Sequence, residues 1–166
     1  RRGRAFAGAE GGVRGFGKQR VVTVHMIKLC VGVDDVEHLA RLQAGRLSDI
    51  RRKGQPPVLK HVTRNTPKNA NQILDGGSIY WVIKGFIRVR QPIIGIEPVD
   101  RSDGRPACAL VLDPNLVRTE IKSYHPFQGW RYLAVEVAPA DAPPSNGSDA
   151  GVPAEMAAEL KALGLL

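Results

Sequence analysis

The sequence is poor in aromatic residues and cysteine, and it has no long apolar run. Aromatic residues make up 5% of the 166 residues, whereas the hydrophobic share of 43% is ordinary for a folded domain. Two cysteines, Cys30 and Cys108, lie far apart in apolar segments, which favours buried thiols in a reducing compartment over a disulfide framework. No run reaches the roughly 18 apolar residues of a membrane span. The basic N-terminus also lacks the apolar stretch of a secretory signal. We therefore expect a soluble, cytoplasmic protein without a membrane partner.

Positive charge is distributed unevenly along the chain. The net charge is +8, and residues 1–20 hold six Lys and Arg against Glu10 alone. A second basic segment, residues 46–105, holds twelve Lys and Arg against five acidic residues, so the rest of the chain is acidic overall. Such asymmetry predicts a basic face, which is a feature of proteins that bind nucleic acid.

Composition divides the chain into four parts. Residues 1–21 are rich in Gly and Arg without apolar periodicity, so we expect a disordered basic leader. Two origins are open for it: a start codon assigned too far upstream, or an RNA-binding arm. Residues 22–137 are expected to form a single domain. Residues 138–152 are rich in Pro, Ala and Gly, which predicts a flexible linker, and residues 153–166 have the apolar stripe of a C-terminal helix.

The pattern of the domain predicts an α+β fold. Apolar, β-rich runs predict strands over residues 21–31, 58–65, 78–84, 86–91, 92–99, 106–112 and 117–122. Asp34 is the expected N-cap of a helix that continues to about Ser48. A second, short helix is expected to begin at Thr66-Pro67 and to end at Gly76-Gly77. Strands joined mostly by hairpins, with two early helices, predict a compact, mostly antiparallel β-barrel or a strongly bent sheet.

No motif identifies catalytic, cofactor-binding or metal-binding residues. The four histidines are scattered, and none has a Cys or His neighbour at a metal-ligand spacing. We therefore predict no metal and no cofactor, and we favour a non-enzymatic binding module while leaving enzymatic activity open. Two alternatives remain open. One is a hydrolase-type enzyme for small molecules that uses His61, Asp113 or His125, and the other is a protein-interaction domain that uses the C-terminal helix.

The strongest candidate for a binding surface surrounds Gly85. If the alternation of side chains continues through this glycine, Tyr80 and Lys84 share a face with the aromatic and basic residues of the next strand. Arg64 and Lys68 would extend that face from the start of the second helix. Aromatic rings that stack on bases, among cations that neutralise phosphates, are typical of proteins that bind single-stranded nucleic acid. The predicted site for RNA or single-stranded DNA comprises Arg64, Lys68, Tyr80, Lys84, Phe86, Arg88 and Arg90. The alternative interpretation is an ordinary solvated sheet face.

A compact aromatic cluster is formed by Phe127, Trp130 and Tyr132. Such a cluster can line the rim of a ligand site or close one end of a small barrel, with Arg131 stacked on a ring. We interpret it as part of the core.

Five runs carry a family resemblance over about residues 22–133. They are TVHMIKLCVG (23–32), HVTRNTPK (61–68), DGGSIYWVIKG (75–85), ALVLDP (109–114) and PFQGWRYL (126–133). The chain resembles the bacterial domain-of-unknown-function family 1489. This resemblance implies an alphaproteobacterial relative, and it supplies no activity and no functional residues.

A weaker resemblance rests on YWVIKG (80–85) followed by IGI (94–96). It is to the PUA-like superfamily, which includes the ASCH and EVE domains. It implies a small β-barrel that binds RNA or modified bases.

Overall fold

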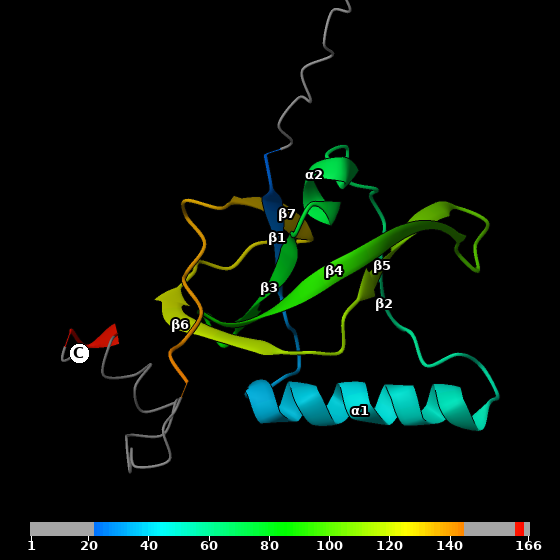
Figure 1. Ribbon diagram of the computed structural model, residues 1–166, viewed down its shortest axis with the longest axis horizontal. Coiled ribbons are helices and arrows are strands. Elements are labelled where there is room, and N and C mark those ends of the chain that lie inside the picture. The colour runs from blue at the N-terminus through cyan, green and yellow to red at the C-terminus, as the bar shows by residue number, and fades with distance from the viewer. Residues whose placement is uncertain (1–21, 145–161, 165–166) are drawn as a thin grey trace, which may run out of the picture.

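The computed structural model describes residues 22–144 and 162–164 and contains one mixed sheet with two helices (Figure 1). The elements are β1 (Val24–Leu29), α1 (Val36–Arg52), β2 (Leu59–Thr63), α2 (Ala70–Leu74), β3 (Ser78–Ile83), β4 (Phe86–Asp100), β5 (Pro106–Leu112), β6 (Val117–Ser123) and β7 (Trp130–Ala134). The predicted leader lies outside the described residues, as do most of the predicted linker and C-terminal helix.

One mixed sheet with two helices confirms the α+β class. The sheet is open, so the predicted barrel is not formed. Its strand order is β2-β5-β4-β3-β1-β7, and β6 pairs with β4 away from this path. The pair β1–β3 is parallel and the other pairs are antiparallel. Strand β1 pairs with β3 on one side and with β7 on the other, so it has no free edge to which β2 could pair and close a barrel.

Side chains, rather than backbone pairing, connect the two ends of the sheet. The indole Nε1–H of Trp130 in β7 donates to the carbonyl oxygen of Asn65, just after β2, at 3.3 Å. The Asn69 N–H donates to the hydroxyl oxygen of Tyr132 at 3.2 Å. Strands must approach to about 4.8 Å to form a ladder. Because bulky aromatic rings lie between these ends, we infer that the backbones cannot approach that closely. We call the resulting gap between β2 and the β1–β7 pair the seam.

Strand β4 is shared by the two halves of the sheet. It was predicted as two strands, 86–91 and 92–99, but it is continuous for 15 residues. Its first half pairs with β3 as far as Pro92, and its second half pairs with β5 from Ile93 onward. Pro92 is tolerated because this is where β4 changes partner, so the missing N–H breaks no regular ladder.

Two apolar clusters form the core, one on each face of the sheet. The larger cluster includes Met26, Trp81 and Leu110, together with Val36 and Leu39 of α1. In Figure 1, α1 lies across one end of the bent sheet, below β3, β4 and β6. The smaller cluster, on the opposite face, consists of Ile27, Tyr80, Val82, Ile87, Phe127 and Leu133. Tyr80, expected on a binding surface, is therefore a core residue.

Both helices exist, but their starts differ from those predicted. Asp35, not Asp34, caps α1, because its Oδ1 accepts the N–H of His38 at 2.7 Å. Helix α2 begins at Ala70 rather than at Thr66-Pro67. It ends as predicted, and Gly76 has a φ of +83°, a conformation that glycine adopts easily.

Candidate nucleic-acid interface

The surface predicted around Gly85 is divided between the two faces of the sheet. Lys84 and Gly85 form a two-residue hairpin turn, with φ angles of 48° and 83°, and Ile83 pairs with Phe86. Residues that flank such a turn lie opposite each other and share a face. Phe86 therefore lies on the same face of the sheet as Ile83, whereas Tyr80 lies on the other face. The prediction was wrong here because it treated Gly85 as a bend within one strand, whereas the chain reverses.

A β-bulge at Arg88 separates the predicted residues further. Trp81 pairs with Val89 and Val82 pairs with Ile87, so Arg88 is an extra residue in β4. A bulge shifts the alternation of side chains by one residue. Arg90 therefore pairs with Tyr80 across the β3–β4 ladder, and the two side chains share a face. The result is two separate pairs: Tyr80 with Arg90, and Phe86 with Arg88.

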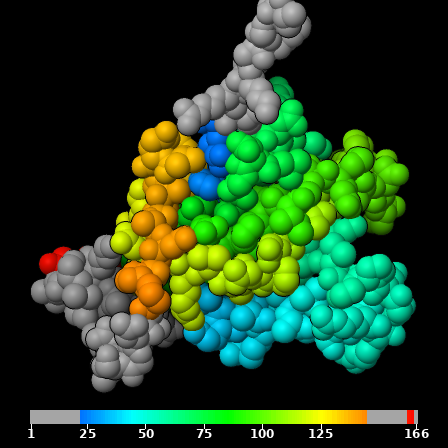
Figure 2. All heavy atoms as spheres, in the orientation of Figure 1, coloured from blue at the N-terminus to red at the C-terminus, as the bar shows by residue number. Residues whose placement is uncertain are grey.

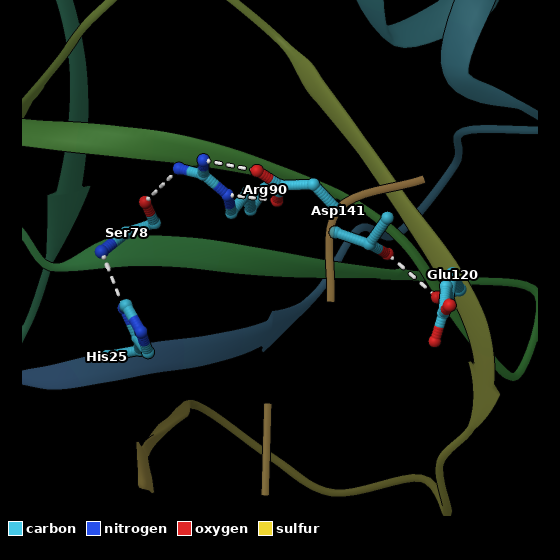
Figure 3. Close-up of polar contacts among 6 residues, drawn as sticks. His25, Ser78, Arg90, Glu120 and Asp141 are labelled. Atoms are coloured by element: carbon cyan, nitrogen blue, oxygen red, sulfur yellow. Dashed lines mark hydrogen bonds and ion pairs between the residues drawn. The ribbon is translucent and has the colours of Figure 1, made fainter. Parts of the chain in front are cut away.

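Residues 138–142, which we call the covering segment, lie over Tyr80 and Arg90. Arg90 donates from Nε and Nη2 to the two carboxylate oxygens of Asp141, at 2.7 and 2.9 Å, and from Nη1 to Ser78 Oγ at 3.0 Å (Figure 3). The Ser78 N–H in turn donates to His25 Nδ1 at 3.0 Å. Tyr80 has 4% of its surface exposed, and burial raises the pKa of its hydroxyl. It is therefore not available to stack on a base.

The covering segment is bonded to β6, although composition assigned it to the flexible linker. The Glu120 N–H donates to the Ala140 carbonyl at 2.8 Å (Figure 3). The Ala142 N–H donates to the Arg118 carbonyl at 2.9 Å. Figure 2 shows this orange stretch running beside the green strands and yellow β6. The folded part of the chain therefore extends past residue 137. The hydrogen bonds from Arg90 also hold the pKa of Asp141 below its ordinary value.

A different basic surface lies along the seam. Three adjoining hollows, of about 270, 420 and 580 Å³, share lining residues: Lys28 belongs to the first two, and Arg64, Asn65 and Trp130 to the last two. We call them together the seam groove. Five cations line it: Arg46, Lys28, Lys60, Arg64 and Lys68. No Asp or Glu is among the described residues that line the three hollows.

Most of these cations are not neutralised by the protein. Lys60 forms an ion pair with Glu97 at 2.8 Å. Within residues 22–144, no carboxylate lies within ion-pairing distance of Lys28, Arg46, Arg64 or Lys68. By contrast, Lys84, from the predicted site, is paired with Asp34 at 3.3 Å. The seam groove therefore has an uncompensated positive potential, which attracts anions.

Two aromatic rings lie among these cations. Trp130 and Tyr132 are two residues apart in β7, so they share a face, and their ring centroids are 5.0 Å apart at an interplanar angle of 80°. Tyr132 is 38% exposed, and Trp130 is half-buried. Arg131 lies on the opposite face of β7, stacked on the ring of Phe127 at 4.9 Å.

Of the seven predicted site residues, Arg64 and Lys68 lie in the seam groove. The prediction missed Lys28, Arg46 and the two rings of β7. Lys28 pairs with Trp130 across the β1–β7 ladder, a contact between residues about a hundred positions apart. The clustering of aromatic residues near position 130 was a usable signal, but it was interpreted as core.

His61 lies inside the groove as a neutral group. Its ring packs edge-on against Trp81, with centroids 5.3 Å apart, and its Nε2 has no hydrogen-bond partner among the described residues. Burial, and then the nearby charges of Lys28 and Arg46, lower the pKa of His61 to about 4. Burial likewise raises the pKa of Cys30, which lines the same hollow, to about 11.

The residues of the alternative enzymatic hypothesis make separate local contacts. Asp113 Oδ1 accepts the Asn115 N–H at 2.9 Å, and His125 stacks on Tyr124 with centroids 4.8 Å apart. Neither contact includes His61. Across the part of the chain that the structure describes, no three His, Cys, Asp or Glu side chains are grouped to hold a metal ion. No helix of that part is long and apolar enough to cross a membrane.

The low pKa of His61 predicts a loss of stability in mild acid. The unfolded chain binds a proton near pH 6.5, but the folded protein does so near pH 4, so stability falls as the pH drops between these values. Between pH 7 and pH 5 we expect His61 to account for a loss of about 2 kcal/mol. Urea unfolding of the wild type and of His61→Gln at both pH values measures it as a difference, which cancels the other titrating groups. Equal losses in the two proteins would contradict the prediction.

The structure thus defines an α+β protein with an open, bent sheet and a basic groove along its seam. The chain matches the model of the family described as "Protein of unknown function (DUF1489)" over residues 26–166, and it belongs to that family. The match extends past residue 133, where the resemblance seen in the sequence ended. No curated protein and no solved structure matches the chain.

Proposed function

We propose that the protein binds RNA or single-stranded DNA in the seam groove. The observation that carries this proposal is the concentration of four unpaired cations, the exposed Tyr132 and the half-buried Trp130 in a groove lined by no described carboxylate. An ordinary solvated face carries both signs of charge, as the opposite side of this sheet does with Arg90 and Asp141. We propose a binding protein rather than an enzyme, acting in the cytoplasm.

Each part of the groove has a role in this proposal. Lys28, Arg64 and Lys68 neutralise backbone phosphates, and Arg46 extends the cationic line onto α1. Tyr132 provides a ring face for a base, which typically contributes about 1–3 kcal/mol. Asn65 and Gln128, which also line the groove, offer side-chain amides to base edges. Stacking on Tyr132 requires an unstacked base, so single strands are preferred over duplexes.

The weaker resemblance to PUA-like domains adds a fold-level analogy to this proposal. Those domains bind RNA with small barrels, whereas the sheet of this protein is open. The proposal therefore rests on the charges and rings of the seam, because a fold alone does not specify function.

Fluorescence anisotropy of the full chain with a 12-nucleotide single strand, from 50 to 200 mM salt, tests the proposal. With four phosphate contacts, the slope of log K against log salt is expected to be about −3. Lys28→Gln/Arg64→Gln removes two contacts, so it should halve this slope and weaken binding about 10-fold or more at 100 mM salt. Tyr132→Ala should weaken binding by about 10-fold while leaving the slope unchanged.

The matched control is Lys84→Gln/Arg131→Gln, which removes the same charge from outside the groove. Lys84 lies in the β3–β4 turn and Arg131 on the opposite face of β7. The leader, residues 1–21, is present in every variant, so its arginines contribute equally. Control binding within about twofold of the wild type is expected. An equal loss in both double variants, or no binding at 50 mM salt, would refute the seam groove as the site.

A further inference from the structure

A second cavity lies away from the seam, at the start of α1. Its volume is about 570 Å³, within the range of small-molecule sites. It is enclosed by the first turn of α1, the β4 bulge, β6 and the end of the covering segment. No residue of the seam groove lines it, so a ligand in this cavity would bind independently of the proposed nucleic-acid site.

Arg88 is the unusual residue of this cavity. It is 93% buried, and its Nε and Nη1 have no hydrogen-bond partner among the described residues. Its guanidinium carbon lies 5.8 Å from the centre of the Phe86 ring. A buried guanidinium is normally paired with a carboxylate, because burying an unpaired charge is costly. Arg88 therefore lacks the acceptor that its environment requires.

Two of the three carboxylates around the cavity have other partners. Glu37 is paired with Arg118, and Asp35 caps the N–H of His38. Glu120 also lines the cavity, but it forms no ion pair with Arg88. None of the three acidic residues that line the cavity forms an ion pair with Arg88.

The N-terminus of α1 adds to the positive potential at this point. Asp35 accepts the amides of His38 and Leu39, through its side chain and its carbonyl. The amides of Val36 and Glu37 have no acceptor among the described residues, and both residues line the cavity. Free amides at the start of a 17-residue helix favour an anion. The helix end and the unpaired Arg88 are independent features that favour the same kind of ligand.

We propose that this cavity binds a small carboxylate with an apolar body, held by Arg88. The planar guanidinium matches a planar carboxylate with two parallel hydrogen bonds. Val36 and Pro143 provide apolar walls for the body of the ligand. A singly charged group is favoured over a phosphate, because Asp35 and Glu120 repel a doubly charged group more strongly than a singly charged one.

Thermal unfolding of the full chain with 10 mM benzoate or hexanoate tests this site, with phenyl phosphate as the doubly charged comparison. A carboxylate that binds with a Kd near 0.1 mM is expected to raise the wild-type Tm by about 5 °C or more. Arg88→Met keeps the length and apolar stem of the side chain but removes the charge. It should unfold without ligand at or above the wild-type Tm, and it should show no shift with carboxylate. Arg88→Lys keeps the charge without the planar fork, and at least a 10-fold loss of affinity is expected.

Arg131→Met is the matched control, because Arg131 also stacks on a phenylalanine but lies on β7. It should respond to carboxylate as the wild type does. The proposal is overturned if carboxylates do not raise the wild-type Tm, or if Arg88→Met is stabilised equally by them. It is also overturned if Arg88→Met and Arg88→Lys both unfold far below the wild type, since Arg88 would then be structural. A larger shift with phenyl phosphate than with benzoate would overturn the choice of a carboxylate.

Discussion

Gly77→Ala is expected to destabilise the protein by about 3 kcal/mol or more. A Cβ on Gly77 would lie 2.3 Å from the Ile73 carbonyl oxygen and 2.6 Å from the Val24 carbonyl oxygen. Both are backbone atoms, so neither can move aside by a change of rotamer. The Gly77 N–H also donates to the Ile73 carbonyl at 2.7 Å, which holds Gly77 against the last turn of α2. Relief of the overlap would require α2 or β1 to shift, and overpacking of this kind is costly.

Urea unfolding measures this effect, and Gly45→Ala provides a matched control. Gly45 lies inside α1, and nothing lies within 4 Å of the position its Cβ would occupy. The same substitution is therefore expected to stabilise the protein there by about 0.5–1 kcal/mol, since alanine favours helix and restricts the unfolded chain. Similar stability for the two variants would show that Gly77 has room for a side chain.

The second large effect is expected from Gln91→Leu. Gln91 is fully buried, and it exchanges two hydrogen bonds of 2.9 Å with Gln43 of α1. Its Oε1 also accepts the Trp81 indole N–H at 3.2 Å, and its Nε2 donates to the Asp113 carbonyl at 2.8 Å. Leucine removes these hydrogen bonds from the buried Gln43 and Trp81 side chains and from the half-buried Asp113 carbonyl. Each such group costs about 1–3 kcal/mol, so a total loss of about 3–5 kcal/mol is expected.

A double-mutant cycle with Gln43→Leu separates the network from simple packing. In Gln43→Leu/Gln91→Leu, two apolar side chains face each other and the Gln43 amide is no longer stranded. The double variant is therefore expected to be less destabilised than the sum of the single variants. Gln55→Leu, at an exposed position just after α1, should change stability by less than about 0.5 kcal/mol. Strict additivity of the two buried substitutions would contradict a shared network.

The elements themselves could be predicted because their signals are local. Alternating or continuous apolar runs mark β3 and β5, and the Arg101–Gly104 turn joins β4 to β5 as expected. The end of α2 was predicted because only glycine easily takes the conformation found at Gly76. The helix starts were less accurate, since adjacent aspartates, Asp34 and Asp35, compete for the same cap.

Faces of strands could be predicted only up to a turn or a bulge. Treating Gly85 as a bend, rather than as half of a two-residue turn, placed Tyr80 and Phe86 on the same face, whereas they lie on opposite faces of the sheet. The bulge at Arg88 then returns Arg90 to the face of Tyr80, away from Phe86 and Arg88. Each error is a shift of one residue, but with a side-chain period of two it moves a residue from the surface to the core. These shifts divide the predicted strand-pair surface between the two faces of the sheet, and all five of its residues lie outside the seam groove.

By itself, the sequence determined the α+β class, the positions of the elements from β1 to β6, the family, and the basic character of the segment that contains Arg64 and Lys68. It missed β7, and it divided β4 into two strands. Only the tertiary structure decided which cations remain unpaired and which rings lie beside them. Asp141 neutralises Arg90 from a segment that composition assigned to a linker, and Lys28 meets Trp130 through a ladder between β1 and β7. The physical reason is that charge and aromatic character belong to single residues, whereas neutralisation and access depend on contacts between distant ones.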